Sequence, residues 1–297
     1  MNIEEQPLIT IGLTTYNRPK LLRRTLENLS SQDYASLEII VSDNGSPGEE
    51  VPALMSEFTQ RDPRIKYHRH PVNRGMAFNW NYVMEQARGK YFMHASDDDI
   101  HERHLVSELV ALMEADPSAA VAFCEHRAVD PGGIPQPAYG PHFAALKALS
   151  TPVKWLRQIR FFLQDERSGK SNLVYGLIRI SFLDGFRWAK FHELYSEQGC
   201  DVLFGFRMLC RGPLAVSPHT LFSSCVGNVK SYSSGGGGFL CRNFSHLYLM
   251  AGYSLQYPKI ASGGMRFVLL ALWPVKMLLV VYAMVWNKVK IFLQKRV

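Results

Sequence analysis

Three consecutive carboxylates, Asp97, Asp98 and Asp99, follow an apolar run and are the residues of this chain best suited to chemistry. Adjacent carboxylates repel one another, so such a run is unfavourable unless a cation neutralises it. Ligation by oxygen alone favours a hard ion, Mn²⁺ or Mg²⁺, which can also bridge to the phosphates of a substrate. We therefore expect a divalent metal site. The alternative is an acidic loop that opens a helix near Ile100, where negative charge is favourable.

The segment Thr14-Thr15-Tyr16-Asn17-Arg18 follows the first apolar run and offers a hydroxyl, an aromatic face and an amide. These groups could hold the base and ribose of a nucleotide. A dinucleotide-binding fold would need G-x-G-x-x-G at this place, and a P-loop would need G-x-x-x-x-G-K-[ST]. Because neither pattern is present, NAD-dependent enzymes and P-loop NTPases are disfavoured.

Two further polar segments, residues 42–46 and 73–75, each follow another apolar run. Asp43 could accept a hydrogen bond from a base N–H or a ribose hydroxyl, and the alternative is a turn formed by Ser42-Asp43-Asn44-Gly45-Ser46. Asn73 could cap the next helix. Arg74, near the start of that helix, could pair with a diphosphate.

Other kinds of site have less support. His101 and His104 lie beside the acidic triplet, but no cysteine or third histidine completes a zinc set. Five scattered cysteines without a C-x-x-C pair argue against a disulfide framework and are typical of a reducing cytoplasm. The G-x-S-x-G segment of serine hydrolases is missing. Residues 1–6 lack the apolar core of a signal peptide, so we expect the chain to stay inside the cell.

Short β-rich runs alternate with helical patterns from residue 7 to about residue 127. Pro19 opens the first helical pattern, in which Leu22, Leu26 and Leu29 recur at helical spacing. This alternation predicts an α/β fold with a mostly parallel, doubly wound sheet, in which ligands bind at the carboxyl ends of the strands. The expected strands are Leu8–Leu13, Leu37–Val41, Ile65–His68, Tyr91–Ala95 and Val121–Cys124.

The second half begins after a Pro/Gly-rich loop at residues 130–141. A basic amphipathic helix is expected at Val153–Leu163, with Trp155, Ile159 and Phe162 on one side. The other expected elements are a strand at Asn172–Ile178, a helix at Cys200–Leu209 and a flexible loop at Ser233–Gly238.

An apolar segment, Phe267–Trp286, is 20 residues long and is interrupted by Pro274 and Lys276. This length is only just enough to cross a bilayer. A lysine at the bilayer centre costs about 2.5–3.5 kcal/mol, which disfavours a simple span. We expect a monotopic or re-entrant anchor. The alternatives are a spanning helix, a helix buried against the protein's own core and an oligomer contact. The flanking basic residues are Arg266, Lys288, Lys290, Lys295 and Arg296.

Together, the four polar segments resemble those of a family 2 glycosyltransferase with the Rossmann-like GT-A fold, an inverting enzyme. The likeness covers about residues 7–130 and continues more loosely to about residue 215. It implies a nucleoside-diphosphate sugar as donor and Mn²⁺ or Mg²⁺ as cofactor. The family's D-x-D-D pattern departs here at Ala95, and the likeness ranks Asp98 first as metal ligand, with Asp97 and Asp99 beside it. The implied donor-binding residues are Thr15, Tyr16, Asn17, Arg18, Asp43, Asn73, Arg74 and Asp97.

The same resemblance implies that Asp201 is the catalytic base. In the family this aspartate begins a helix in the second half, commonly within a Glu-Asp pair. Glu197-Gln198-Gly199-Cys200-Asp201 matches, with Cys200 in the glutamate position. An N-cap role for Asp201 is the alternative and is compatible with catalysis. Lys230 is a weak counterpart of the arginine that often contacts the diphosphate.

Composition limits the class of protein. The chain has 297 residues, of which 47% are hydrophobic and 20% are charged, so disordered and fibrous classes are excluded. A net charge of +7 suits an anionic partner. Nucleic acid is disfavoured, because the charge is dispersed and no recognised binding module is present.

The expected activity is transfer of a sugar, with a UDP-sugar favoured as donor, to a hydroxyl of a glycan or lipid-linked glycan. We expect it at the cytoplasmic face of the cell membrane, in surface-polysaccharide synthesis. The alternatives are a sugar nucleotidyltransferase and a non-catalytic, membrane-bound GT-A scaffold. The expected parts are residues 1–130 for the donor, residues 131–230 for the acceptor and base, and residues 231–297 as a C-terminal helical, membrane-associated extension.

Overall fold

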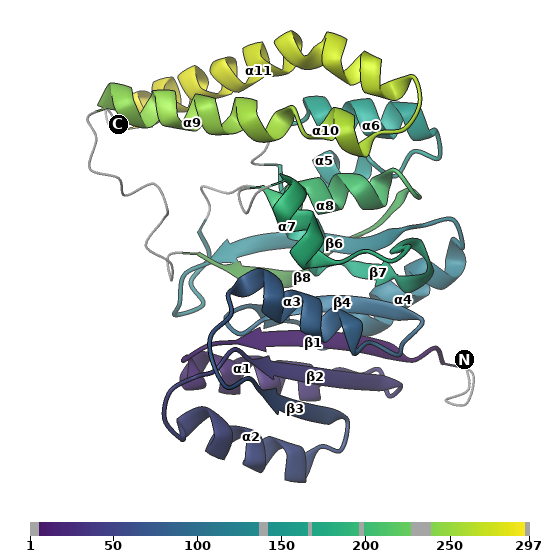
Figure 1. Ribbon diagram of the computed structural model, residues 1–297, viewed down its shortest axis with the longest axis vertical. Helices are drawn as coiled ribbons and strands as arrows, with labels where there is room; N and C mark the ends of the chain where they lie inside the picture. The colour runs from purple at the N-terminus through teal and green to yellow at the C-terminus, as the bar shows by residue number, and fades with distance from the viewer. Residues whose placement is uncertain (1–5, 137–141, 166–167, 196–198, 227–238, 295–297) are drawn as a thin grey trace.

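The computed structural model describes residues 6–136, 142–165, 168–195, 199–226 and 239–294. A mixed sheet forms its centre, helices pack on both faces of the sheet, and a further helical layer covers one end of the molecule (Figure 1). The expected α/β fold is therefore confirmed. The expected loop at Ser233–Gly238 and the residues Glu197, Gln198 and Lys230 lie outside the described residues.

The sheet has eight strands in the order β3-β2-β1-β4-β7-β6-β8-β5. The first four strands in this order are parallel, β7 runs antiparallel to both of its neighbours, and β6 pairs in parallel with β8. All five expected strands are present, and each continues beyond its predicted end. The strands are β1 Ile9–Thr15, β2 Leu37–Asp43, β3 Ile65–Arg69, β4 Tyr91–Ser96, β5 Ile100–His101, β6 Val121–Val129, β7 Leu177–Arg179 and β8 Leu214–Cys225.

The helices follow the apolar spacing of the sequence. In the first helix, Pro19 occupies the first turn, and Leu22, Leu26 and Leu29 are fully buried, as predicted. The α-helices are α1 Pro19–Ser30, α2 Glu50–Arg61, α3 Met76–Glu85, α4 Leu105–Ala115, α5 Phe143–Lys147, α6 Lys154–Leu163, α7 Trp188–Tyr195, α8 Cys200–Leu209, α9 Phe239–Ser254, α10 Tyr257–Ile260 and α11 Met265–Gln294. Two 3-10 helices are η3 Lys170–Tyr175 and η4 Ile180–Phe182.

Two sequence-based expectations for the elements are wrong. A helix does not begin near Ile100, because Ile100 and His101 form β5 and pair with β8; α4 starts only at Leu105. The acidic triplet therefore lies in a turn between two strands. The expected strand at Asn172–Ile178 is instead η3 followed by the short strand β7, because Leu173 and Val174 are buried as part of η3.

The expected basic helix exists as α6, but its buried side differs from the prediction. Phe162 is buried, whereas Trp155 is 57% exposed. Arg157 is buried instead, because its guanidinium donates hydrogen bonds to the carbonyl oxygens of Leu209 (2.6 Å) and Thr151 (2.9 Å). This positive charge stabilises the C-terminal end of α8 and is not available to a membrane.

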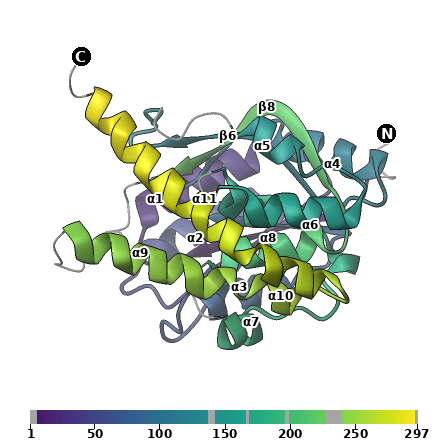
Figure 2. The ribbon, with the colours of Figure 1, turned by 90° about the horizontal axis from the view of Figure 1, so that it is seen from above.

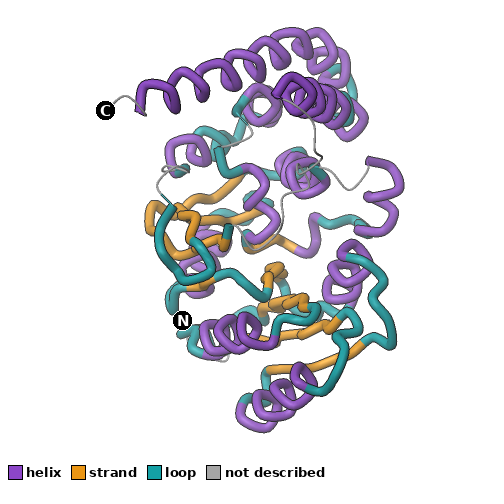
Figure 3. Tube along the Cα trace, turned by 90° about the vertical axis from the view of Figure 1, so that its left-hand side faces the viewer, coloured by secondary structure: helices purple, strands orange, loops and turns teal. Residues whose placement is uncertain are grey.

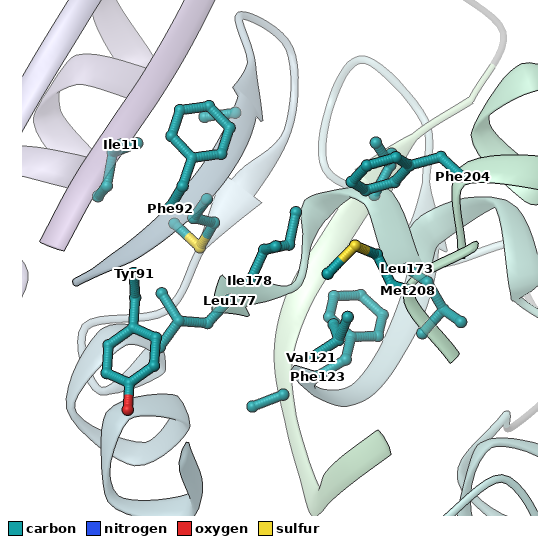
Figure 4. Close-up of a cluster of buried hydrophobic side chains, with 14 of the residues drawn as sticks. Ile11, Tyr91, Phe92, Val121, Phe123, Leu173, Leu177, Ile178, Phe204 and Met208 are labelled. Carbon is teal, nitrogen blue, oxygen red and sulfur yellow. The ribbon is translucent and has the colours of Figure 1, made fainter. Parts of the chain in front are cut away.

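One core joins the two halves of the sheet. Side chains from β1, β4, β6, β7, η3 and α8 form one cluster of buried residues around the short strand β7 (Figure 4). The labelled members are Ile11, Tyr91, Phe92, Val121, Phe123, Leu173, Leu177, Ile178, Phe204 and Met208. The C-terminal helices α9 and α11 lie across the end of the molecule that carries α6 and α8 (Figure 2).

Candidate active site

Parallel pairing brings three of the polar segments to one edge of the sheet. Thr15, at the end of β1, pairs with Asp43 at the end of β2, and Thr14 pairs with Ser96 at the end of β4. The residues that follow these strands are therefore neighbours, as expected for a ligand site at the carboxyl ends of parallel strands.

Two members of the acidic triplet share one positive charge. The Arg18 guanidinium lies 3.2 Å from Asp97 and 3.1 Å from Asp98. The Thr15 hydroxyl donates a 2.7 Å hydrogen bond to the other oxygen of Asp97. Burial raises the pKa of Asp97 to about 6, although Thr15 and Arg18 act to lower it. No pattern in the sequence predicted that Arg18 would contact the triplet.

The other carboxylates are held differently. Asp98 accepts a 2.8 Å hydrogen bond from the Ser96 hydroxyl. Asp99 is buried, accepts a 3.0 Å hydrogen bond from the backbone N–H of Cys225, and has a pKa that burial raises well above its usual range. Asp99 thus ties the turn to the end of β8. Ala95 is only 2% exposed within β4, so Ser96 is the residue before the triplet that contacts it.

Asn44 connects two of the predicted segments, a role that the sequence analysis missed. Its amide donates to Asn73 Oδ1 (2.9 Å) and to the Gly75 carbonyl (3.0 Å), and its oxygen accepts the backbone N–H of Arg74 (3.0 Å). Gly45 has a φ of 78°, and a Cβ there would lie 2.7 Å from the backbone of Val72. Only glycine permits this close approach. The alternative role of Asn73, as the cap of the next helix, is wrong, since Gly75 occupies the N-cap position of α3.

Asp43 forms the turn that was its alternative role. One oxygen accepts the N–H of Ser46 (2.8 Å), and the other accepts the Tyr67 hydroxyl (2.9 Å). Asn17, with a φ of 56°, donates its backbone N–H to the Ser46 hydroxyl (2.7 Å). The neighbouring Tyr16 is 44% exposed. The loops after β1 and β2 are therefore bonded to each other at Asn17, the residue that follows the exposed Tyr16.

Arg74 is exposed, and its guanidinium lies over the Phe78 ring at 3.7 Å from the centroid. A cation held by an aromatic face keeps hydrogen-bond donors free for an anion. This geometry suits the phosphate contact that the sequence suggests for Arg74.

Asp201 lies in the first turn of α8, and its Oδ1 accepts the backbone N–H of Val202 (2.8 Å). The alternative N-cap role is wrong, because Gly199 occupies the N-cap position with a left-handed φ of 75°. Cys200, in the family's glutamate position, is only 2% exposed.

Tyr175, at the end of η3, relates Asp201 to the acidic triplet. Burial raises the pKa of its phenol well above the usual range, and the carboxylates of the triplet and of Asp201 raise it further. All four carboxylates therefore lie close enough to act on one phenol. The ring packs between Trp80, at 6.2 Å, and Phe222, at 5.5 Å between centroids. Tyr175 was not predicted from the sequence, because only the fold brings it to this site.

The residues at this edge suit a divalent ion that is shared with a substrate. Asp97 and Asp98 already hold a cationic guanidinium between them. Within the described ranges, no three His, Cys, Asp or Glu side chains converge to form a metal site on their own. Mg²⁺ commonly takes one or two carboxylates and completes its shell with water and phosphate oxygens. The zinc alternative has no geometric support, since His101 is buried while His104 bonds to Asp33 at 2.6 Å.

The match to a protein family decides the class. The model described as Glycosyl transferase family 2 matches residues 10–179, more than half of the chain. The chain belongs to this family. This glycosyltransferase is 32% identical over 94 residues to the GalNAc(5)-diNAcBac-PP-undecaprenol beta-1,3-glucosyltransferase of Campylobacter jejuni, covering 31% of this chain and 30% of that protein. An uncharacterized glycosyltransferase of Methanocaldococcus jannaschii is 30% identical over 97 residues, covering 32% and 33%.

The alignments with the first curated relatives span between 14% and 34% of those proteins' own lengths. Similarity to solved structures is wider and shows the GT-A fold. S. aureus TarS (residues 1–349), solved in complex with UDP-GlcNAc, matches at a TM-score of 0.61 and 17% identity, over 91% of this glycosyltransferase and 72% of that chain. The mannosyltransferase PcManGT of Pyrobaculum calidifontis, solved with GDP-Man and Mn²⁺, matches at 0.57 and 17%, over 97% and 76%.

Proposed function

We propose that this family 2 glycosyltransferase is an inverting enzyme that transfers a sugar from a UDP-sugar to a hydroxyl of a glycan or lipid-linked glycan. The observation that carries the proposal is the pair of carboxylates, Asp97 and Asp98, at the carboxyl ends of β1 and β4. Both pair with the guanidinium of Arg18. Such a site is suited to a donor that arrives with its own phosphates and a metal ion. Residues 1–130 hold the donor, and residues 131–230 hold the acceptor and supply the base.

On the donor side, the loop after β1 and the loop after β2 hold the nucleoside. Tyr16 offers its exposed ring to the base. Asp43 and Asn17 bond to Ser46 and so hold the loop after β2 against the loop after β1. Arg74 donates to the diphosphate. Asp98 and Asp97 are the proposed ligands of Mn²⁺ or Mg²⁺. When bound, the metal would neutralise negative charge on the departing nucleoside diphosphate.

On the acceptor side, Asp201 removes the proton from the attacking hydroxyl. The backbone N–H of Val202 holds one of its oxygens and so orients the carboxylate. The hydroxyl attacks the anomeric carbon from the face opposite the leaving diphosphate. One displacement inverts the configuration, and no covalent sugar–enzyme intermediate forms.

Thermal unfolding in the presence of nucleotides tests the donor site. A bound ligand stabilises the native state by RT ln(1 + [L]/Kd), which is about 2.7 kcal/mol at a hundredfold excess over Kd. We expect UDP with Mn²⁺ to raise the melting temperature more than GDP, CDP or dTDP does. Asp98→Asn should abolish the manganese-dependent part, whereas Asp116→Asn, a control at the end of α4, should not. No shift with any nucleotide would contradict the proposal.

The substitution Asp201→Asn tests the base. An amide cannot accept the acceptor proton, so we expect turnover to fall by about 10²–10⁴-fold while the thermal shift with UDP and Mn²⁺ is retained. Release of UDP, measured with a coupled assay, gives the turnover. Release of pyrophosphate instead would indicate a sugar nucleotidyltransferase, and normal turnover in the variant would remove Asp201 as the base.

The proposed cellular site is the cytoplasmic face of the membrane, in surface-polysaccharide synthesis. The Campylobacter jejuni relative is named for an acceptor linked to undecaprenol by a diphosphate, which supports a lipid-linked acceptor. Lipid extracts offered as acceptors, with and without prior removal of diphosphate-linked glycans, would test this class of acceptor. Equal transfer to both extracts would contradict it.

A further inference from the structure

The helix α11 carries two opposite stripes of side chains. Along one stripe, Leu269 and Lys276 are buried, and Trp273 between them is partly covered. Along the other stripe, Phe267 is 71% exposed and Leu278 is 70% exposed. The spacing of three to four residues keeps each stripe on one side of the helix. Both sides of this helix are therefore mainly apolar. One side is packed against the protein, and the other is exposed.

The docked stripe holds the only charge inside the apolar segment. Lys276 is 1% exposed, and its ammonium group donates a 2.9 Å hydrogen bond to the carbonyl of Gln164, the C-cap residue of α6. The negative end of that helix favours a cation at this place. In addition, the Trp273 indole donates to the Ser254 hydroxyl of α9 at 3.0 Å. The lysine that argues against a membrane helix in the sequence thus faces the protein.

The open stripe continues to the end of the apolar segment. Tyr282 is 64% exposed, Val285 is 56% exposed, and the stacked rings of Tyr282 and Trp286 lie 6.4 Å apart. From Phe267 to Val285 the stripe extends about 27 Å along the helix. Within the described residues, α11 is the single helix that is long and apolar enough to cross a membrane. Only 17% of its most apolar 18-residue stretch is buried inside the protein. An exposed apolar patch of this length marks an interaction surface.

The distribution of charge selects the partner. All 26 acidic residues lie between positions 1 and 201, whereas 11 of the 33 Lys and Arg residues follow Asp201. Arg266 and Lys259, beside the open stripe in the chain, are both exposed. A region without any acidic residue is attracted to anionic lipid headgroups, by about 1 kcal/mol for each basic residue near the surface.

We propose that α11 lies in the plane of an anionic lipid bilayer, with its open stripe inserted at the interface and its docked stripe fixed to the catalytic domain. Spanning would require lipid around the whole helix, and this would break the bonds of Lys276 and Trp273. The inference does not depend on catalysis, and nucleotide binding in the same samples would report separately on the proposed function.

Sedimentation with vesicles of phosphatidylcholine containing about one third phosphatidylglycerol tests the proposal with the full chain. We expect the parent protein to bind these vesicles, and Leu278→Glu to reduce the affinity about tenfold or more. The matched control is Leu194→Glu, because Leu194 on α7 is also exposed (58%) and should not contact lipid. Equal losses in the two variants would overturn the proposal.

Two further measurements separate the other occupants. A tag placed after Val297 should stay accessible to protease added outside sealed vesicles, whereas protection of the tag would indicate a span. In solution, light scattering should not detect a dimer of the parent protein that the substitution Leu278→Glu dissociates into monomers. A dimer of this kind, together with a lack of vesicle binding, would assign the open stripe to a second copy of the chain.

Discussion

At the scale of single residues, Arg18 defines the state of the site without its donor. Its guanidinium lies between two carboxylates that we propose as metal ligands, at 3.2 and 3.1 Å. Adjacent carboxylates repel one another, and Arg18 relieves this repulsion. A metal ion must therefore compete with an internal cation for the same two groups.

The substitution Arg18→Gln should therefore tighten metal binding in the absence of nucleotide. We expect the affinity for Mn²⁺ to rise about tenfold, which corresponds to about 1.4 kcal/mol, because the competing cation is gone. Titration of free Mn²⁺ by electron paramagnetic resonance measures the affinity. Arg23→Gln is the control, since Arg23 pairs with Glu57 at the surface. An unchanged or weaker affinity would show that Arg18 does not compete with the ion.

Asp97 should make the stability of the protein depend on pH. Its pKa is raised to about 6 in the native state, and an unfolded aspartate has a pKa of about 3.9. Between these values the native state retains a proton that the unfolded state has lost, so the free energy of unfolding falls as the pH rises.

Asp97→Asn removes this dependence. Relative to the parent protein, we expect the variant to gain up to about 3 kcal/mol in free energy of unfolding between about pH 4 and pH 7. Urea unfolding without metal or nucleotide provides the measurement. The same variant should lose donor binding. The carboxylate of Asp97 would thus lower the free energy of unfolding at neutral pH and still be needed for binding. A difference between the two proteins that does not change with pH would contradict the prediction.

The sequence predicted the kinds of residue in the site better than their partners. Thr15, Asp43 and Asp97 follow apolar runs, and strand pairing brings their positions together as expected. Asn44 could not be found in this way, since its three hydrogen bonds reach a loop about 30 residues later. Tyr175 lies in a 3-10 helix that periodicity presented as part of a strand.

At the scale of elements, α11 shows what a linear pattern of hydropathy leaves out. Pro274 and Lys276 look like interruptions of an apolar segment, yet the helix runs through both from Met265 to Gln294. The charged interruption, Lys276, lies on the side that is docked to α6, α9 and α10, whereas Pro274 is exposed on the other side. Which side of a helix packs against the protein depends on tertiary contacts. The hydropathy pattern of α11 therefore did not predict its buried side.

Lys276→Met tests the contact between α11 and α6. The variant keeps much of the side-chain volume and removes the donor to the Gln164 carbonyl, so we expect the free energy of unfolding to fall by about 1–3 kcal/mol. Proteolysis within residues 262–264, which link α10 to α11, should also become faster. Lys259→Met, at an exposed lysine of α10, is the control. Equal behaviour of both variants would show that Lys276 does not hold α11 in place.

At the scale of the whole molecule, the proposed donor site and the C-terminal helices occupy different ends. The strands β1–β3 with α1 and α2 form one end, and α9 and α11 form the other (Figures 1 and 3). The assignment of donor binding to the first half stays a prediction. The sequence predicted the helical C-terminal extension. It did not predict the antiparallel strand β7, which joins β4 to β6 and makes one sheet of the two halves.

Removal of the last helix should damage the fold and not simply release a soluble enzyme. A chain ending at Gly264 lacks Leu269 and Lys276, both buried against the rest of the molecule. Burial of a leucine side chain contributes about 1.5–3 kcal/mol, so we expect a lower melting temperature and aggregation. Leu278→Glu should leave the melting temperature nearly unchanged while it weakens vesicle binding. A truncated chain as stable as the parent would show that α11 is not part of the fold.

The contact of α11 with α6 has a consequence for the choice of acceptor. If α11 rests on a bilayer, α6 and α8 hold Asp201 at one fixed height above the lipid. An acceptor hydroxyl reaches that height only when the right number of sugars separates it from its lipid. The enzyme would then select glycans by their length as well as by the identity of their terminal sugar.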